Sequence, residues 1–374
     1  MKKKVLIVFG TRPEGIKMAP LVKEFEKHSH LFDVKVCITG QHREMLDQVL
    51  SFFEIKPHFD LNLMRPNQNL YSLTSDIILK LKPVLEIFDP NFVFVHGDTT
   101  TAMAASIASF YYGAKICHVE AGLRTFDIKS PFPEEMNRSV ISVASSFHFA
   151  PTPTSKENLL KENKKEENII ITGNTVIDSL IYTFNKVNSD FNDAEISSLK
   201  AQIIPKKKII LVTGHRRENH GKGFLNICKA LREIANKNED CEILYPVHLN
   251  PNVQKPVYKH LKNVKNIKLL SPLSYPAFVW LMGRSYLILT DSGGVQEEAP
   301  SLGVPVLVMR EKTERPEAVA AGTVILVGVN VNDIVEETNS LLRDSKKHES
   351  MSKLHNPYGD GKACEKILKH IMNI

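Results

Sequence analysis

The sequence predicts an α/β fold made of two doubly wound, Rossmann-like domains with parallel sheets. Three observations support this prediction. The chain has 374 residues, more than one hydrophobic core usually supports at about 150 residues per domain. Short apolar runs rich in β-branched residues alternate with longer amphipathic stretches along the whole chain. The alternation forms two series, which are separated by a polar segment at 185–205.

The first series predicts an N-terminal domain over residues 1–172. A helix is expected over 16–26, where apolar side chains recur at helical spacing. Strands are expected over 5–9, 34–39, 92–96, 115–119, 147–150 and 169–172. Helical patterns separate these strands, as crossover connections in a parallel sheet require.

The second series predicts a C-terminal, nucleotide-binding domain over residues 173–360. The polar segment 185–205 is interpreted as the linker region, and a helix over 361–374 is expected to cross back onto the first domain. Strands are expected over 208–213, 242–247, 267–270, 286–289, 304–308 and 323–326. Ligands of such folds bind in the crevice at the carboxyl ends of the strands, so we expect function there.

Composition excludes several classes of protein. The net charge of +6 is spread along the chain, whereas a nucleic-acid binder concentrates its basic residues. The five cysteines are odd in number and lack paired Cys-x-x-Cys spacing, so neither a disulfide framework nor a zinc site is expected. No apolar run approaches the ~20 residues that cross a bilayer, and the N-terminus is too short in apolar residues for a signal peptide. A cytoplasmic protein without membrane or nucleic-acid partners is predicted.

Two turns have the composition of phosphate-binding sites. The first expected strand ends in a glycine-bounded turn at 10–17 that opens a helix and carries Arg12 and Lys17. Its spacing is not G-x-G-x-x-G, so a nicotinamide dinucleotide site is not supported, and a plain tight turn is the alternative. The segment 290–298 contains Ser292 followed by two glycines at a helix start, with Glu298 one turn further on. An ordinary capped βα connection is the alternative there.

Carboxylates follow several expected strands of the first domain. Asp98 comes directly after the strand 92–96, and Glu120 follows the next strand. Glu134 lies in the loop beyond them. Each has a structural alternative, as a helix cap, an ion-pair partner or a first-turn acid. Together they favour an acid/base site at one edge of the sheet.

The segment 213–219 follows the first strand of the second domain. It contains His215 and two arginines, a composition suited to binding an anion. Its place matches that of the 10–17 turn in the first domain. A solvated charged loop is the alternative.

These motifs, taken together, resemble the non-hydrolysing UDP-N-acetylglucosamine 2-epimerases along nearly the whole chain. The turn Thr11-Arg12-Pro13-Glu14 argues against the hydrolysing relatives. The resemblance rests on the segments 9–20, 41–43, 96–100, 118–125, 133–138, 173–175, 215–219 and 291–298.

The resemblance implies a GT-B-type fold, a homodimer, and an enzyme that supplies UDP-N-acetylmannosamine for surface polysaccharides. It implies catalytic roles for Asp98, Glu120, Glu134 and His215. The UDP-sugar would be bound by Arg12, Lys17, Phe278, Ser292, Gly293, Gly294, Glu298 and Arg315. Activation by substrate at a second site would involve Gln41, His42, Glu135, Arg216 and His248.

The chemistry of the sugar suggests the mechanism. The C2 proton is not acidic, because no carbonyl is conjugated to that carbon, so elimination of UDP to 2-acetamidoglucal and re-addition is expected. No metal and no redox cofactor are needed. Two alternatives differ in class: a GT-B glycosyltransferase that passes the sugar to an acceptor, and a non-catalytic UDP-sugar sensor.

Overall fold

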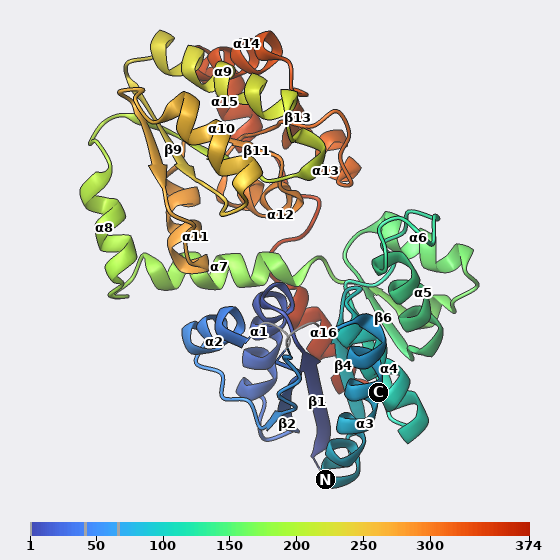
Figure 1. Ribbon diagram of the computed structural model, residues 1–374. Coiled ribbons are helices and arrows are strands. Elements are labelled where there is room, and N and C mark those ends of the chain that lie inside the picture. The colour runs from blue at the N-terminus through green and yellow to red at the C-terminus, as the bar shows by residue number, and fades with distance from the viewer. Residues whose placement is uncertain (1, 41–42, 66–67) are drawn as a thin grey trace. The chain divides into compact units, whose positions relative to one another are not determined.

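The chain forms two compact units, each built around a parallel sheet (Figure 1). The computed structural model describes residues 2–40, 43–65 and 68–374. Unit 1 consists of Met1–Ser179 with Tyr358–Ile374, and unit 2 of Leu180–Pro357. The predicted α/β class with two Rossmann-like sheets is confirmed.

The sheet of unit 1 has seven strands within the described residues, in the order β3-β2-β1-β4-β5-β6-β7. Every pair is parallel. The strands are β1 (Lys3–Phe9), β2 (Phe32–Ile38), β3 (Phe59–Asp60), β4 (Phe92–His96), β5 (Lys115–Val119), β6 (Phe147–Ala150) and β7 (Ile169–Ile171). β1 and β4 are central and buried, which is why they read as continuous apolar runs.

Helices of unit 1 gather in two groups. Helices α1 and α2 pack together, and the C-terminal helix α16 packs on α1, as Figure 1 shows for the red helix beside α1. Helices α3, α4 and α5 form the other group. The bounds are α1 (Arg12–Lys27), α2 (Arg43–Phe52), α3 (Leu70–Phe88), α4 (Thr100–Tyr112), α5 (Glu134–Ala144), α6 (Pro153–Lys161) and α16 (Ala363–Met372). Helix α7 (Thr175–Val187) begins in unit 1 and ends in unit 2.

The sheet of unit 2 has six parallel strands in the order β10-β9-β8-β11-β12-β13. The strands are β8 (Lys208–Thr213), β9 (Cys241–Pro246), β10 (Ile267–Leu270), β11 (Leu287–Thr290), β12 (Val306–Val308) and β13 (Val324–Leu326). The helices are α8 (Ala194–Gln202), α9 (Lys222–Lys237), α10 (Pro251–Leu261), α11 (Tyr275–Arg284), α12 (Gly293–Glu298), α13 (Pro316–Ala320), α14 (Val331–Arg343) and α15 (Ser345–Ser352). Of the helices described in either unit, none is long and apolar enough to cross a membrane.

The sequence-based interpretation missed two short elements. The segment taken as the linker region contains α8, whose start is capped by Asp193 and which buries Ile196 and Leu199. A polar helix with two buried residues has little periodicity to detect. The edge strand β3 was not expected either, because two residues carry no alternation.

The order of the strands indicates at which edge of each sheet a ligand is expected to bind. The order reverses between β1 and β4 in unit 1, and between β8 and β11 in unit 2. Ligands of doubly wound sheets bind beside such switch points, at the carboxyl ends of the strands.

Candidate active site

The turn between β1 and α1 is held by its own side chains. The Glu14 carboxylate accepts hydrogen bonds from the backbone N–H of Gly10 (3.1 Å) and of Thr11 (2.8 Å). Its second oxygen accepts from Thr99 Oγ1 at 2.6 Å, which ties the turn to the start of α4. The turn therefore presents Arg12, the first residue of α1, from a fixed backbone.

Glu120 follows β5 with a backbone φ of 62°. This left-handed conformation costs a non-glycine residue on the order of 1 kcal/mol or more. Its carboxylate oxygen Oε2 forms an ion pair with Lys17, accepts from Asn174 Nδ2 at 2.8 Å and lies 3.6 Å from His96 Nε2. Lys17, which is predicted to bind the UDP-sugar, is thus also an ion-pair partner of Glu120.

The surroundings of the Glu120 carboxylate determine its charge. Burial of the carboxylate opposes its ionisation, but the Lys17 ammonium and the His96 ring outweigh burial and hold the pKa of Glu120 well below its ordinary value. Glu120 is therefore a carboxylate at neutral pH. It can accept a proton or stabilise a developing positive charge.

Asp98 follows β4, the strand that pairs with β5. Its carboxylate forms an ion pair with Arg138 of α5, and its backbone carbonyl accepts from Asn137 Nδ2 at 2.9 Å. Glu134 is half-buried at the first residue of α5, where the helix dipole favours an acid. The contacts of Asp98 thus tie its loop to the helix that carries Glu134.

Glu135, predicted for a second ligand site, is buried and occupied by protein groups. Its Oε1 accepts from the backbone N–H of Thr125 (3.1 Å) and Phe126 (3.0 Å). Its Oε2 accepts from Arg138 Nη1 at 3.0 Å. Glu135 therefore joins the 125–126 loop to the same arginine that pairs with Asp98.

Two buried histidines lie side by side beneath this edge of the sheet. His118 of β5 and His148 of β6 are partners in the strand register. Nε2 of His118 lies 2.7 Å from the carbonyl oxygen of Gly97, the residue before Asp98. Burial lowers the pKa of His118 to about 3 and that of His148 to about 4. Both rings are therefore neutral at neutral pH.

These two histidines predict a loss of stability in mild acid. Below about pH 6.5 the unfolded chain protonates both rings while the folded chain does not, so unfolding takes up protons and is favoured as the pH falls. At pH 5 the expected loss is about 2 kcal/mol per histidine. Urea unfolding at pH 7.5 and pH 5 measures it. The variant His148→Asn should lose less stability between these two pH values than the parent, and an equal loss would contradict the prediction.

In unit 2, Asp291 organises the loop that follows β8. This fully buried carboxylate accepts from the backbone N–H of His215 (3.0 Å) and Arg216 (2.9 Å) and from Asn219 Nδ2 (3.2 Å). Asp291 itself follows β11, the strand next to β8. The loop after β8 is thereby joined to the end of β11 through three donors that share one side chain.

Two guanidinium groups flank the glycine start of α12. A Cβ added to Gly293 would lie 3.6 Å from Nη2 of both Arg216 and Arg315. Ser292 precedes this glycine as the N-cap residue, and Gly294 follows it. Arg315 also forms an ion pair with Glu297. Backbone N–H groups and two cations thus meet at a place without side-chain bulk, which suits a diphosphate.

Glu298 lies at the end of α12 and is buried. Its Oε1 accepts a hydrogen bond from the Tyr275 hydroxyl at 3.0 Å. Tyr275 is the first residue of α11, and the half-buried Phe278 lies one turn further along that helix. An aromatic ring and an oriented carboxylate therefore come from adjoining elements, as recognition of a base and a ribose requires.

His215 and His248 stack, with ring centroids 5.5 Å apart. Burial, with help from His248 and Arg216, lowers the pKa of His215 against the opposing charge of Asp291. His215 Nδ1 lies 3.4 Å from Asp291 Oδ1. Gln41 and His42, predicted for the second site with His248, lie outside the described residues.

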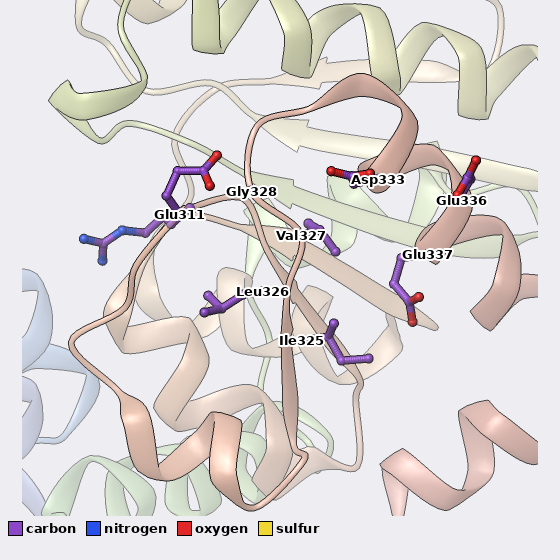
Figure 2. A pocket seen from close by; sticks show the side chains of 9 residues that line it. Glu311, Ile325, Leu326, Val327, Gly328, Asp333, Glu336 and Glu337 are labelled. Carbon is purple, nitrogen blue, oxygen red and sulfur yellow. The ribbon is translucent and has the colours of Figure 1, made fainter.

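Unit 2 also has an acidic pocket of about 410 Å³ (Figure 2). Figure 2 shows Glu311 facing it from one side and the acids of α14 from the other. Such a lining repels a diphosphate, and none of the site residues predicted within the described ranges belongs to it. No group of three or more His, Cys, Asp and Glu side chains in these ranges could hold a metal ion. The pocket is lined by Arg310, Glu311, Ile325, Leu326, Val327, Gly328, Asp333, Glu336 and Glu337.

Sequence reasoning assigned no role to four residues that contact predicted site residues. His96 and Asn174 contact Glu120, Asn219 contacts Asp291, and Tyr275 contacts Glu298. The first three lie in the motifs noted above, at strand ends. That position is the signal that could have marked them.

Several known proteins that are similar to this chain are UDP-N-acetylglucosamine 2-epimerases. A family model described as UDP-N-acetylglucosamine 2-epimerase matches residues 23–372. A UDP-N-acetylglucosamine 2-epimerase from Campylobacter jejuni is 58% identical over 372 residues, which cover 98% of this chain and 97% of the relative. The crystal structure of the Neisseria meningitidis enzyme bound to UDP-N-acetylglucosamine is 51% identical, with a TM-score of 0.90 over 99% of this chain and 100% of the other. The Methanocaldococcus jannaschii enzyme in complex with UDP-N-acetylglucosamine and UDP is 32% identical, with a TM-score of 0.79 over 99% and 100% of the two chains.

Proposed function

The chain belongs to the UDP-N-acetylglucosamine 2-epimerase family, and we propose that it inverts C2 of UDP-N-acetylglucosamine by eliminating UDP and adding it back. The product is UDP-N-acetylmannosamine. The observation that carries the mechanism is that Asp98 and Glu120, the latter ion-paired with Lys17, follow two paired strands. Carboxylates so placed can remove a proton and stabilise positive charge at a sugar carbon.

The proposed reaction proceeds through a neutral unsaturated sugar. A carboxylate takes the C2 proton while the C1–O bond breaks, and UDP leaves with the electron pair of that bond. The two carbons are then joined by a double bond, as 2-acetamidoglucal. A proton is delivered to the opposite face of C2, and a β-phosphate oxygen of UDP re-forms the bond to C1. Atoms and charge balance over the cycle without an added oxidant or reductant.

The residues divide by chemistry. Asp98, Glu120 and Glu134 of unit 1 would serve the sugar and between them supply a base, an acid and a group that stabilises positive charge. Ser292, Gly293, Gly294, Arg216 and Arg315 of unit 2 would hold the diphosphate, with His215 beside it. Arg216 Nε is buried without a hydrogen-bond partner among the described residues, which supports an anion there. Glu298 and Phe278 would contact the ribose and uracil, and Arg12 would add charge near the phosphates.

Proton NMR in heavy water tests the proposal. Purified protein with UDP-N-acetylglucosamine alone should place deuterium at C2 and produce the manno isomer. A glycosyltransferase would leave C2 untouched in the absence of an acceptor, and a sensor would bind without turnover. An ¹⁸O label in the bridging position between C1 and the β-phosphorus should scramble into the non-bridging β-phosphate positions. Deuterium exchange without scrambling would overturn the elimination.

We propose regulation by a second molecule of substrate. Arg216 lies against Gly293 at the diphosphate site, and His248 stacks on His215, so a ligand that touched Arg216 and His248 would influence both. Gln41, His42 and Glu135 stay sequence-based predictions for a second substrate site. Initial rates against UDP-N-acetylglucosamine should then be sigmoidal. His248→Ala should make them hyperbolic, and an unchanged Hill coefficient would count against this role.

We propose that two copies of the chain associate through helix α3. Tyr71, Leu79 and Ile87 occur at multiples of four residues along α3 and are 89%, 69% and 77% exposed. At about 100° per residue, side chains eight positions apart are turned by about 80°, so Leu79 lies between Tyr71 and Ile87 on the exposed side of α3. Phe110, 61% exposed on the adjoining α4, adds to the apolar area. Exposed apolar area of this extent favours a self-complementary contact between two copies of the chain.

A charge on this face should separate the dimer. Leu79→Glu is expected to raise the dimer dissociation constant about 30-fold or more, since it buries an unpaired charge at an apolar contact. Sedimentation velocity over a concentration series measures the change. Leu160→Glu, on the partly exposed α6 of the same unit, is the control and should leave the dissociation constant unchanged. A monomeric parent protein would refute the dimer.

The location and pathway are also proposals. Five buried, unpaired cysteine thiols suit the reducing cytoplasm. UDP-N-acetylmannosamine made there would serve as a precursor of surface polysaccharides.

A further inference from the structure

We propose that His96 and Asn174 are positioning residues, which hold one oxygen of the Glu120 carboxylate so that the other faces the sugar. The inference rests on the proposed function, in which Glu120 acts on C1 or C2. It adds two things to that function. It names the residues that orient Glu120, and it identifies Oε1 as the oxygen that faces the sugar.

The contacts of Glu120 are asymmetric. Lys17 Nζ, Asn174 Nδ2 and His96 Nε2 all approach Oε2. Within the described part of the chain, Oε1 receives no hydrogen bond. It lies beside Gly97, where an added Cβ would be 3.8 Å away. An oxygen left without a donor in a carboxylate whose other oxygen is held by three groups is the one available to a substrate.

The Asn174 side chain is fixed in one orientation. Its Oδ1 accepts from the backbone N–H of Val176 at 3.0 Å, so the NH₂ group faces Glu120 and donates at 2.8 Å. Its own backbone N–H donates to the Tyr358 carbonyl at 2.7 Å. The preceding Gly173 packs so closely that a Cβ would lie 3.2 Å from Gly359 Cα. The returning C-terminal segment therefore locks the turn that carries Asn174.

His96 is the third group that lies close to Oε2 of Glu120. It ends β4, is 4% exposed, and its Nε2 makes no hydrogen bond among the described residues. This nitrogen lies 3.6 Å from Oε2, so a small movement would complete a hydrogen bond. Buried polar groups without partners are rare, and they cluster where function requires them.

The backbone of Glu120 requires such support. Its φ of 62° is sparsely populated for a residue with a side chain and persists only where the surroundings determine it. The titratable groups that face its carboxylate are Lys17 from α1 and His96 from β4. The first turn of α7 contributes no charge to Oε2, only the neutral amide of Asn174. Weakening these contacts should change both the orientation and the ionisation of Glu120.

The test compares variants by deuterium exchange at C2 as a function of pH. Asn174→Asp places a second carboxylate against Oε2, so Glu120 should protonate more readily. As the pH is lowered, deuterium exchange at C2 should therefore be lost at a pH at least one unit higher than in the parent. Asn174→Ser and His96→Gln should lower kcat about 10- to 100-fold with little change in KM, as loss of orienting contacts does elsewhere. Asn158→Ser is the matched control, because Asn158 is a buried amide in the same unit that donates to the Gly122 carbonyl. It should cost comparable stability without moving the pH profile.

The outcomes separate this inference from the proposed function. If Asn174→Asp is folded and shows the parent's pH profile, and the other two variants keep the parent's kcat, the positioning role is wrong. If Glu120→Gln retains full exchange, the proposed function itself is wrong. Loss of exchange in Glu120→Gln together with a raised acid limb in Asn174→Asp supports both.

Discussion

Replacing Glu120 by glutamine should lower kcat for epimerisation by about 10³-fold or more. The amide cannot take a proton from C2 or balance positive charge at C1, and general acid–base groups contribute factors of 10² to 10⁴. It also leaves Lys17 and His96 without the anion that they face. NMR assays of product formation and of C2 exchange measure the loss.

The same change in another ion pair of unit 1, whose glutamate is only partly buried, provides the control. Glu162 pairs with Arg124 through two hydrogen bonds, of 2.5 and 2.8 Å, in the same unit. Glu162→Gln should destabilise the protein but leave kcat within a few-fold of the parent. Equal losses of kcat in Glu120→Gln and Glu162→Gln would indicate a structural role for Glu120 and no catalytic one.

Replacing Asp291 by alanine should destabilise unit 2 by about 3–5 kcal/mol. The fully buried carboxylate accepts from two backbone N–H groups and from Asn219, and all three donors would lose their acceptor. The loop with His215 and Arg216 would lose its anchor, so UDP binding should weaken at least about 10-fold. Urea unfolding and titration calorimetry with UDP measure the two effects.

The asparagine variant separates charge from hydrogen bonding at this position. Asp291→Asn keeps one acceptor oxygen, so its destabilisation should be roughly half that of Asp291→Ala. Stability within about 0.5 kcal/mol of the parent in Asp291→Ala would contradict the assigned role, since that range is typical of surface substitutions.

Much of the fold could be predicted because buried parallel strands consist of continuous runs of apolar residues, which can be recognised in the sequence. β1 is such a run, and its buried neighbours repeat the pattern. Helix α8 was not predicted, because only Ile196 and Leu199 are buried in it. Short elements are decided by what they pack against, which the local pattern does not contain.

The candidate site was likewise predicted only in part. Asp98 and Glu120 could be selected as carboxylates that follow strands, and β4 and β5 are paired. The partnership of Lys17 with Glu120 joins residues 103 positions apart, and that of Asn174 with Glu120 joins residues 54 positions apart. No local spacing encodes such contacts. The ion pair of Lys17 with Glu120 was therefore not expected, and the role predicted for Lys17 at the UDP-sugar, which rests on the composition of its turn, stays a prediction.

By itself the sequence determined the α/β class, the identity of the polar residues at the strand ends and the resemblance to a family. The tertiary structure alone decided which of those residues touch, which oxygen of Glu120 is held, and that the pKa of its carboxylate stays low in spite of burial. The physical reason is that strand formation depends on local apolar pattern. Ionisation and orientation depend instead on desolvation and on charges brought together from distant segments of the chain.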